Sequence, residues 1–348
     1  MLKNLFGKKL PKKVRINKSG LEFEVGKNQT ILEAALGQNI AYPHDCTVGT
    51  CGSCRSRLTS GKVDAITPFG YTLSREELAD GFILACQAVP KTDVEVEVDL
   101  GAGFDVATCS ARISEMVDLT HDIKRVTWKT DKPVQFQAGQ YMNVSWPGGP
   151  GVRSYSFSNA PAADGNTLLS TFIRKVPGGA FTEKLFSGAF DADTPFTIEA
   201  PHGNFWLRDG DGPIILIGGG SGLSPLMSVL EDALARGVNR NAILLFGGRG
   251  QRDLYCQDDI ARIASAWKGT FDFRPVLSEE DVSGMRHGMV TNEISAAIAD
   301  LGGSAGIQAY MCGPPPMIDA GVSELTRNGV SLGDIHYDKF TDASTVAG

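Results

Sequence analysis

The stretch HDCTVGTCGSC at residues 44–54 holds three cysteines, and a fourth stands alone 32 positions later in LACQA. Together Cys46, Cys51, Cys54 and Cys86 give the spacing C-x4-C-x2-C-x31-C. This spacing is typical of thiolates that hold a [2Fe–2S] cluster, because a tight loop delivers three sulfurs and a distant segment delivers the fourth. Zinc is the alternative, but zinc sites usually present two short cysteine knuckles. The missing second knuckle favours the cluster.

Length and charge narrow the class of protein. A chain of 348 residues predicts two or three domains. Its formal net charge of −7 argues against a nucleic-acid-binding protein, which would carry a basic patch. Since no run approaches about 18 apolar residues, we expect no transmembrane helix.

The first 13 residues are rich in lysine but lack the apolar centre of a secretory signal. We therefore expect a cytoplasmic protein, in which clustered cysteines are more often metal or redox ligands than disulfides. Residues 1–13 have two interpretations. They form either a solvated arm or a peripheral contact with the anionic inner membrane, through Leu2, Leu5 and Phe6 beside the lysines.

The pattern of apolar residues divides the chain into three segments. Residues 14–100 combine a hairpin, a short helix at 30–40 and an alternating strand at 93–98. Residues 107–208 contain short alternating stretches broken by Gly and Pro, which predicts an antiparallel barrel. Residues 212–340 alternate apolar strands with helices, which predicts a parallel sheet. The sequence therefore predicts a multidomain protein of α+β and α/β class.

The first segment resembles a known family. Its HDCTVGTCGSC, SRLTSG and ILACQAVPKTDVEVEV stretches are similar to a plant-type ferredoxin domain of the β-grasp kind. The resemblance covers residues 14–99 and implies a [2Fe–2S] cluster held by the four cysteines. Gly49 and Gly52 would let the loop backbone fold closely around that cluster.

The second segment contains Arg-Ser-Tyr-Ser at 153–156. Between a ferredoxin and an α/β segment, this motif resembles the FAD-binding barrel of the ferredoxin–NADP reductase superfamily. The resemblance implies that Arg153 pairs with the flavin pyrophosphate, Tyr155 packs on the isoalloxazine and Ser156 approaches flavin N5. A planar guanidinium suits phosphate, and a phenol ring offers a stacking face.

A second flavin motif follows at VPGGAFT, residues 176–182. Free backbone amides at such a turn can hold a diphosphate. The resemblance implies cofactor-binding roles for Gly179, Phe181 and Thr182. A simple hairpin turn is the alternative for the same residues.

The third segment opens on GGGSGLSP at 218–225, after the strand PIILI and before a helix. This placement suits a pyrophosphate at a helix N-terminus. The motif departs from G-x-G-x-x-G at Leu223 and instead resembles the nucleotide domain of the same superfamily. The implied binding residues are Gly218, Gly220, Ser221 and Gly222.

CGPP at 312–315 ends a strand and precedes a helix, where α/β sheets place their ligands. The resemblance implies that Cys312 lies beside the nicotinamide and that Gly313 and Pro314 contact the nucleotide. It also implies that Phe340 covers the flavin face. Relatives end on that aromatic, whereas this chain continues for eight residues.

FGGRGQRDLY at 246–255 corresponds to the region that meets the adenosine ribose in the family. Asp253 could bond to a free 2′-hydroxyl and would repel a 2′-phosphate. Arg249 and Arg252 could instead attract that phosphate, so the residues alone leave the coenzyme open. The resemblance to NADH-using oxygenase reductases favours NADH.

The order of ferredoxin, flavin barrel and nucleotide domain resembles the reductase components of bacterial oxygenases. It implies electron transfer from NADH to FAD, then to the [2Fe–2S] cluster, then to an oxygenase hydroxylase component. FAD suits the middle position because flavin exchanges hydride for single electrons. The acceptor expected is the hydroxylase of an aromatic-hydrocarbon monooxygenase, of which a membrane-bound di-iron protein is one form. The alternatives are a Rieske dioxygenase reductase, a deoxysugar reductase and a non-catalytic redox sensor.

Overall fold

The computed structural model describes residues 11–44, 46–101 and 103–340. Contacts divide the chain into two compact units, Met1–Gly103 and Phe104–Gly348. None of the helices within the described ranges has the length and apolar character needed to cross a bilayer. Most of the lysine-rich start lies outside the described residues, so the membrane contact expected of residues 1–13 stays a prediction.

The first unit is built on a five-stranded mixed sheet with the order β2-β1-β7-β3-β5. Helix α1 (Ile31–Gly37) begins at Thr30, whose hydroxyl accepts from the amide of Glu33 while the Glu33 carboxylate accepts from the amide of Thr30. The strands of the sheet are β1 (Lys12–Ile16), β2 (Glu22–Val25), β3 (Arg55–Ser60), β5 (Phe82–Leu84) and β7 (Val94–Glu97). The hairpin, helix and alternating strand expected from the sequence are therefore confirmed.

Smaller elements of this unit lie beside the cysteine loop. Strands β4 (Val63–Ala65) and β6 (Ala88–Pro90) form a separate antiparallel pair. The short helices η1 (Phe69–Tyr71) and α2 (Arg75–Ala79) connect β4 to β5. The loop at 46–54 runs directly into β3, and Cys86 follows β5. Because β3 and β5 are hydrogen-bonded neighbours, the fold carries the fourth cysteine to the loop.

The second unit begins with a six-stranded antiparallel sheet of order β11-β10-β13-β8-β9-β12. A bridge between Phe157 and Thr171 joins the two end strands and closes the sheet on itself. The sheet curls around apolar side chains such as Trp128 and Phe196. Its elements are β8 (Ala107–Asp118), β9 (Ile123–Val134), β10 (Tyr141–Ser145), β11 (Arg153–Ser156), β12 (Asn166–Arg174), α3 (Thr182–Ser187) and β13 (Phe196–His202). The antiparallel barrel expected from the sequence is confirmed.

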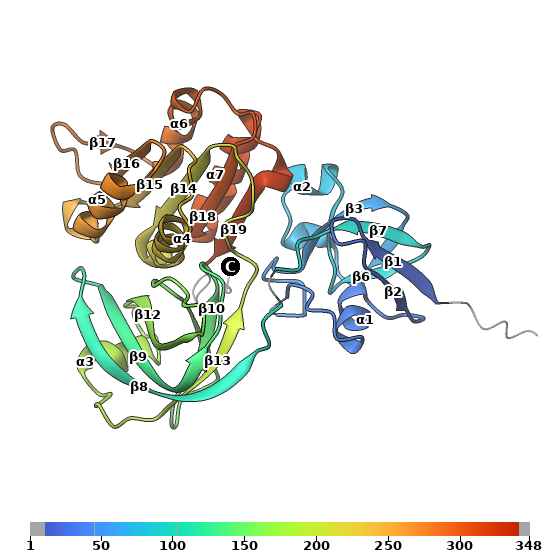
Figure 1. Ribbon diagram of the computed structural model, residues 1–348, viewed down its shortest axis with the longest axis horizontal. Coiled ribbons are helices and arrows are strands. Elements are labelled where there is room, and N and C mark those ends of the chain that lie inside the picture. The colour runs from blue at the N-terminus through green and yellow to red at the C-terminus, as the bar shows by residue number, and fades with distance from the viewer. Residues whose placement is uncertain (1–10, 45, 102, 341–348) are drawn as a thin grey trace, which may run out of the picture. The chain divides into compact units, whose positions relative to one another are not determined.

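A parallel six-stranded sheet of order β17-β16-β15-β14-β18-β19 completes this unit. After β14 the chain adds β15, β16 and β17 on one side of it, and then β18 and β19 on the other side. The strand order therefore reverses between β14 and β18, which is a topological switch point. The strands are β14 (Ile214–Gly219), β15 (Ala242–Gly248), β16 (Phe271–Leu277), β17 (Arg286–His287), β18 (Gln308–Gly313) and β19 (Ile335–Lys339). The helices are η2 (Gly220–Gly222), α4 (Leu223–Ala235), η3 (Gln251–Asp253), α5 (Gln257–Ala266), η4 (Val290–Glu293), α6 (Ile294–Asp300), α7 (Pro315–Arg327) and η5 (Leu332–Asp334). Figure 1 shows these strands in yellow to red, with the green barrel strands beside them.

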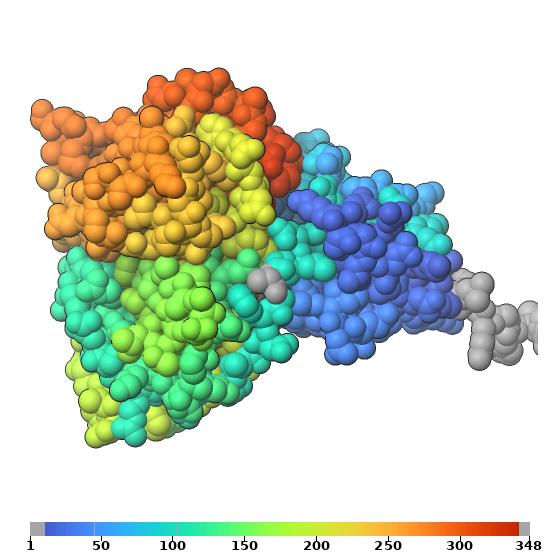
Figure 2. All heavy atoms as spheres, in the orientation of Figure 1, coloured from blue at the N-terminus to red at the C-terminus, as the bar shows by residue number. Residues whose placement is uncertain are grey.

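The barrel and the parallel sheet share one hydrophobic core. Barrel residues Ile123 and Phe172 belong to the same buried cluster as Leu226, Phe246 and Tyr310 of the sheet domain. On the face drawn in Figure 2, the green barrel atoms and the yellow and orange atoms of the sheet domain are packed against each other. This shared burial explains why the two domains behave as a single unit.

Candidate functional site

Backbone amides surround the sulfurs of the cysteine loop. The amides of Thr50 and Cys51 point at Cys46 Sγ, at 3.3 and 3.4 Å, and the amide of Ser53 points at Cys51 Sγ at 3.4 Å. Donors aimed at sulfur stabilise the thiolate and tune a bound iron–sulfur group. The hydrogen bond from the Cys51 thiol, aided by Thr50 and opposed by burial, lowers the pKa of Cys46 to about 4.

The four cysteines fall into two pairs. Cys46 interacts with Cys51, and Cys54 interacts with Cys86. In the second pair, the hydrogen bond from Cys54 lowers the pKa of Cys86 to about 7. The same bond, together with burial, raises the pKa of Cys54.

This pairing separates an iron–sulfur cluster from zinc. No three of the four sulfurs, all within the described residues, lie within 4.8 Å of one another. Four thiolates around one zinc ion would all be about 3.8 Å apart, given Zn–S bonds of about 2.3 Å. Two pairs, linked by weaker charge interactions between Cys51 and Cys54 and between Cys46 and Cys86, instead suit two irons with two thiolates each. The donor set therefore fits a [2Fe–2S] cluster.

Two residues that the sequence did not single out brace the loop. Gln87 Nε2 donates to the carbonyls of Cys86 and Thr47, at 3.0 and 3.3 Å. The hydroxyl of Thr72 donates to the carbonyl of Gly49. Gly49 has a φ of +84°, and a Cβ there would lie 2.8 Å from Gln87 Cγ. Only glycine therefore fits the loop against Gln87.

The predicted flavin residues lie on β11. Arg153 Nη1 donates to the carbonyls of Pro150 and Val152, at 3.3 and 2.8 Å. Burial raises the pKa of Tyr155, which keeps its phenol neutral. Ser156 is buried, and its carbonyl accepts a 2.8 Å hydrogen bond from the Ser224 hydroxyl. The strand thus presents one cation and one half-buried aromatic ring side by side.

The turn at 176–182 is held by its own side chain. Thr182 Oγ1 accepts from the amide of Val176 and donates to its carbonyl, both at 3.1 Å. The amide of Gly179 also bonds to Val176 O, at 2.9 Å. Phe181 is buried and packs on Tyr155, with ring centroids 5.4 Å apart. Thr182 and Phe181 therefore shape the turn and support Tyr155.

The predicted nucleotide residues meet at the switch point. Gly218 on β14 and Cys312 on β18 are register partners, so the glycine turn and the CGPP segment end at the same sheet edge. A Cβ at Gly222 would lie 2.1 Å from the carbonyl oxygen of Cys312, so this approach requires glycine. Ser221 lies in that turn, between Gly220 and Gly222, at the start of α4. A nucleotide at this edge would meet the first turn of α4.

Cys312 is fully buried, and burial raises the pKa of its thiol well above the ordinary value. The amide of Phe340 donates a 2.9 Å hydrogen bond to the carbonyl of Gly313, which fixes Phe340 beside the CGPP segment. Pro314 precedes α7, whose first residue is also proline. The structure thus brings Cys312, Gly313, Pro314 and Phe340 together.

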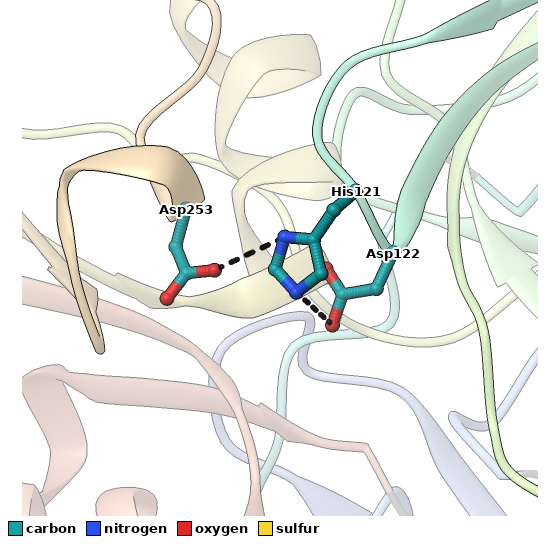
Figure 3. A group of neighbouring side chains, drawn as sticks. All are labelled: His121, Asp122 and Asp253. Atoms are coloured by element: carbon teal, nitrogen blue, oxygen red, sulfur yellow. Dashed lines mark ion pairs between the residues drawn. The ribbon is translucent and has the colours of Figure 1, made fainter.

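Asp253 is held by its own loop. Its Oδ2 accepts from the amides of Arg249 and Gly250, at 2.9 and 3.0 Å. Its Oδ1 is buried and lies 3.6 Å from His121 Nδ1. In Figure 3 the imidazole of His121 lies between Asp253 and Asp122. Burial raises the pKa of Asp253, but the two amides and the charge of Arg249 outweigh it and the net shift is downward.

Two arginines neutralise the group formed by His121, Asp122 and Asp253. Asp122 Oδ2 lies 3.0 Å from Arg174 Nε and 3.4 Å from Arg249 Nη2. The group therefore fastens the barrel turn at 120–122 to the loop at 249–253. Its carboxylates are already neutralised, so they have little to offer a cation.

Other residues at the nucleotide edge were not predicted. Ser224 bridges α4 to the barrel, Arg174 lies beside Gly220, and Tyr255 donates to the carbonyl of Gly220 at 2.8 Å. Glu280 accepts from the backbone amide and the side chain of Gln251, at 2.7 and 3.1 Å. Ser224 and Tyr255 lie inside recognised motifs, whereas Arg174 and Glu280 depend on contacts between distant segments.

Three family models match the chain. A 2Fe-2S iron-sulfur cluster binding domain matches residues 14–91. An oxidoreductase FAD-binding domain matches residues 110–206 and an oxidoreductase NAD-binding domain matches residues 216–322. The fold and the site thus define an oxidoreductase that uses a [2Fe–2S] cluster, FAD and NAD, which confirms the predicted cofactors.

The chain also has relatives that match it over nearly their whole length. The xylene/toluene monooxygenase electron transfer component XylA of Pseudomonas putida is 40% identical, over 94% of this chain and 93% of the relative. The reductase subunit of aromatic O-demethylase from Amycolatopsis sp. (strain ATCC 39116 / 75iv2) is 39% identical, over 94% and 99%. The crystal structure of Amycolatopsis cytochrome P450 reductase GcoB has a TM-score of 0.71 at 37% identity, over 95% and 99%. The chain belongs to the family of iron–sulfur flavoprotein reductase components of oxygenases.

Proposed function

We propose that the protein passes electrons from NADH, by way of FAD and the [2Fe–2S] cluster, to the hydroxylase component of an aromatic-hydrocarbon monooxygenase. The observation that carries this proposal is the arrangement of four cysteines in two pairs. The same chain has a sheet edge suited to a nucleotide, where β14 and β18 end side by side. A single-electron centre and a hydride-donor site in one chain require a converter between them. Bound FAD supplies that exchange between hydride and single electrons.

Arg153, Tyr155 and Ser156 would hold the flavin. Arg153 can turn its guanidinium from two loop carbonyls to a pyrophosphate, which offers stronger charge-assisted bonds. Tyr155 offers a ring braced from behind by Phe181. The Ser156 hydroxyl can donate or accept one proton at the reacting face. Gly179 and Thr182 keep the neighbouring turn in shape for the diphosphate.

The nucleotide edge would hold NADH. Gly218, Gly220, Ser221 and Gly222 leave the first turn of α4 open to the pyrophosphate. Cys312, neutral because it is buried, would sit against the nicotinamide without adding charge. Phe340 would cover the flavin until the nicotinamide displaces it.

The coenzyme preference follows from the loop at 249–253. One carboxylate oxygen of Asp253 accepts from two amides of its own loop. We therefore propose that Asp253 mainly holds the ribose-binding loop in shape and is not the sole contact with the ribose. Glu280 adds a further carboxylate against this loop. A 2′-phosphate would meet the exposed carboxylate of Glu280, which lies outside the neutralised group of Asp122 and Asp253, and this favours NADH over NADPH.

The acceptor has two supported candidates. The 40% identity to a xylene/toluene monooxygenase component favours a hydroxylase of that class. We propose a membrane-bound di-iron protein as one form of this hydroxylase. The nearly equal 39% identity to an aromatic O-demethylase reductase, and the 37% identity to the structure of a cytochrome P450 reductase, favour a cytochrome P450 as the second candidate. A cytoplasmic location, with peripheral contact at the inner membrane, stays part of the first proposal.

Purified holoprotein tests the proposal. We expect about two irons, two inorganic sulfides and one FAD per chain, and bleaching of both chromophores by NADH. Cys86→Ser should lose the cluster signal and cytochrome c reduction but keep NADH-driven reduction of ferricyanide. Protein that binds zinc in place of sulfide, or that ignores NADH, would refute the proposal.

A further inference from the structure

Trp146 carries a buried hydrogen-bond donor that has no acceptor. It directly follows β10, and its side chain is only 5% exposed. Its indole Nε1 is buried and meets no acceptor within the described part of the chain. Other buried indoles are paired, since Trp128 Nε1 donates to the Thr171 hydroxyl at 3.0 Å. Trp267 Nε1 likewise donates to a backbone carbonyl at 2.7 Å. A buried donor without an acceptor costs free energy, so its presence calls for an explanation.

The unpaired donor lies among the residues predicted to bind FAD. The guanidinium of Arg153 lies over the indole of Trp146, 5.7 Å from the ring centroid. Phe181 meets the same indole edge to face, with centroids 4.9 Å apart, and it also packs on Tyr155. Trp146 therefore contacts both the cation expected at the flavin pyrophosphate and the aromatic ring that supports the flavin tyrosine.

Gly149 covers the indole. A Cβ on Gly149 would lie 2.1 Å from Trp146 Cε2 and 2.4 Å from its Nε1, so this approach requires glycine. Arg153 holds the loop that carries Gly149, because its Nη1 donates to two carbonyls of that loop, at 3.3 and 2.8 Å. A turn of Arg153 towards a pyrophosphate would break both bonds. The loop would then be free to shift and uncover the indole nitrogen.

The chemistry of the indole narrows its partner. An indole N–H donates and cannot accept, so the partner must offer an acceptor atom. The diphosphate of FAD offers charged oxygens, and hydrogen bonds to charged acceptors are about twice as strong as neutral ones. Since Arg153 lies over the same indole, a diphosphate bound by Arg153 would come close to this donor.

We propose that Trp146 is a further FAD-binding residue, whose indole N–H donates to the diphosphate beside Arg153. The proposal deepens the flavin site of the proposed function and rests on Arg153 holding that diphosphate. Arg153 then acts twice, because it pairs with the diphosphate and, by leaving the loop carbonyls, uncovers the indole. The cost of the unpaired donor is removed only when FAD is bound, and this difference adds to the affinity for FAD.

The test compares the full-length chain carrying Trp146→Phe with wild type. Phenylalanine keeps an aromatic ring for Arg153 and Phe181 but lacks the N–H. Trp267→Phe is the matched control, because its indole is 7% exposed and already has an acceptor. Two quantities are measured on the full-length chain after removal of its FAD. They are the dissociation constant for added FAD and the urea midpoint of unfolding.

We expect Trp146→Phe to raise the FAD dissociation constant about tenfold, and Trp267→Phe to leave it within about twofold of wild type. Without FAD the order should reverse. Both variants lose part of an indole, but only Trp267→Phe also leaves a carbonyl without its donor, so its urea midpoint should fall further.

Two results would overturn the proposal. One is an FAD dissociation constant for Trp146→Phe within about twofold of wild type. The other is a urea midpoint that falls further in Trp146→Phe than in Trp267→Phe, since the indole would then serve stability and not FAD. A wild-type chain that binds no FAD would instead refute the proposed function.

Discussion

The hydroxyl of Ser224 donates a 2.8 Å hydrogen bond to the carbonyl of Ser156 and accepts a 3.1 Å bond from the amide of Phe172. Ser224 lies in the first turn of α4, whereas Ser156 ends the strand that carries the flavin motif. One buried oxygen therefore fastens the nucleotide turn to the flavin strand. Four residues later, Ser228 donates to the carbonyl of Asn159 at 2.7 Å, so two serines of α4 make three hydrogen bonds to the barrel.

Ser224→Ala should destabilise the second unit and loosen flavin binding. The variant leaves a buried carbonyl and a buried amide without their partner, which costs about 1–3 kcal/mol of unfolding free energy. Ser228→Ala is the matched control, because it removes one part-buried bond farther from the flavin strand. We expect both variants to lower the unfolding free energy, and only Ser224→Ala to weaken FAD retention in dialysis. Equal FAD retention in the two variants would contradict this role of Ser224.

Gly222→Ala should distort the turn before α4 and weaken NADH binding. A Cβ at this position would lie 2.1 Å from the carbonyl oxygen of Cys312 and 3.0 Å from the amide nitrogen of Gly313, so the two strand ends must separate. Overpacking of this kind costs about 1–3 kcal/mol. We expect KM for NADH to rise at least about tenfold, while iron and FAD contents stay close to wild type. Gly333→Ala, where the new Cβ would lie 3.7 Å from Ser331 Oγ, should leave NADH oxidation unchanged.

Local motifs made most of the fold predictable. The spacing of Cys46, Cys51 and Cys54 and the glycine turn after PIILI carry their chemistry within a few residues. Alternating apolar residues in β7 likewise indicate the strand directly. In such segments the local pattern and the final environment agree.

The remaining site residues depend on contacts across the fold. Gln87, Thr72 and Glu280 act on loops that lie far from them in sequence. Asp253 shows that a motif can also mislead. Its place in the motif suggested a ribose contact, yet one of its oxygens accepts a hydrogen bond from its own loop. Spacing predicts where a side chain lies but not which partner it takes.

Glu280→Gln should relax coenzyme selection. The exposed carboxylate of Glu280 accepts from Gln251, which keeps a negative charge beside the loop at 249–253. Removing that charge should raise kcat/KM for NADPH several-fold and leave kcat/KM for NADH within about twofold, because only NADPH carries the 2′-phosphate. Glu115→Gln, an exposed position in β8, is the control for a simple change in net charge. A ratio of NADPH to NADH activity equal to that of wild type would argue against Glu280 as a selector.

Asp253→Asn should destabilise the ribose loop in a pH-dependent way. Two backbone amides and Arg249 bond to the carboxylate and outweigh the effect of burial, so the native pKa lies below the ordinary value. Such a carboxylate contributes stability fully above its unfolded pKa of about 3.9, and loses that contribution as pH falls through the lower native pKa. The amide keeps one acceptor but loses the charge, which should cost about 1 kcal/mol at neutral pH. The difference in Tm between wild type and the variant should therefore hold steady from about pH 8 to 5 and shrink below about pH 4.

Asp164→Asn, in an exposed turn, should show no such difference at any pH. A difference for Asp253→Asn that grew on acidification would mean that the native carboxylate is protonated more readily than the unfolded one, the reverse of what its two amide donors imply.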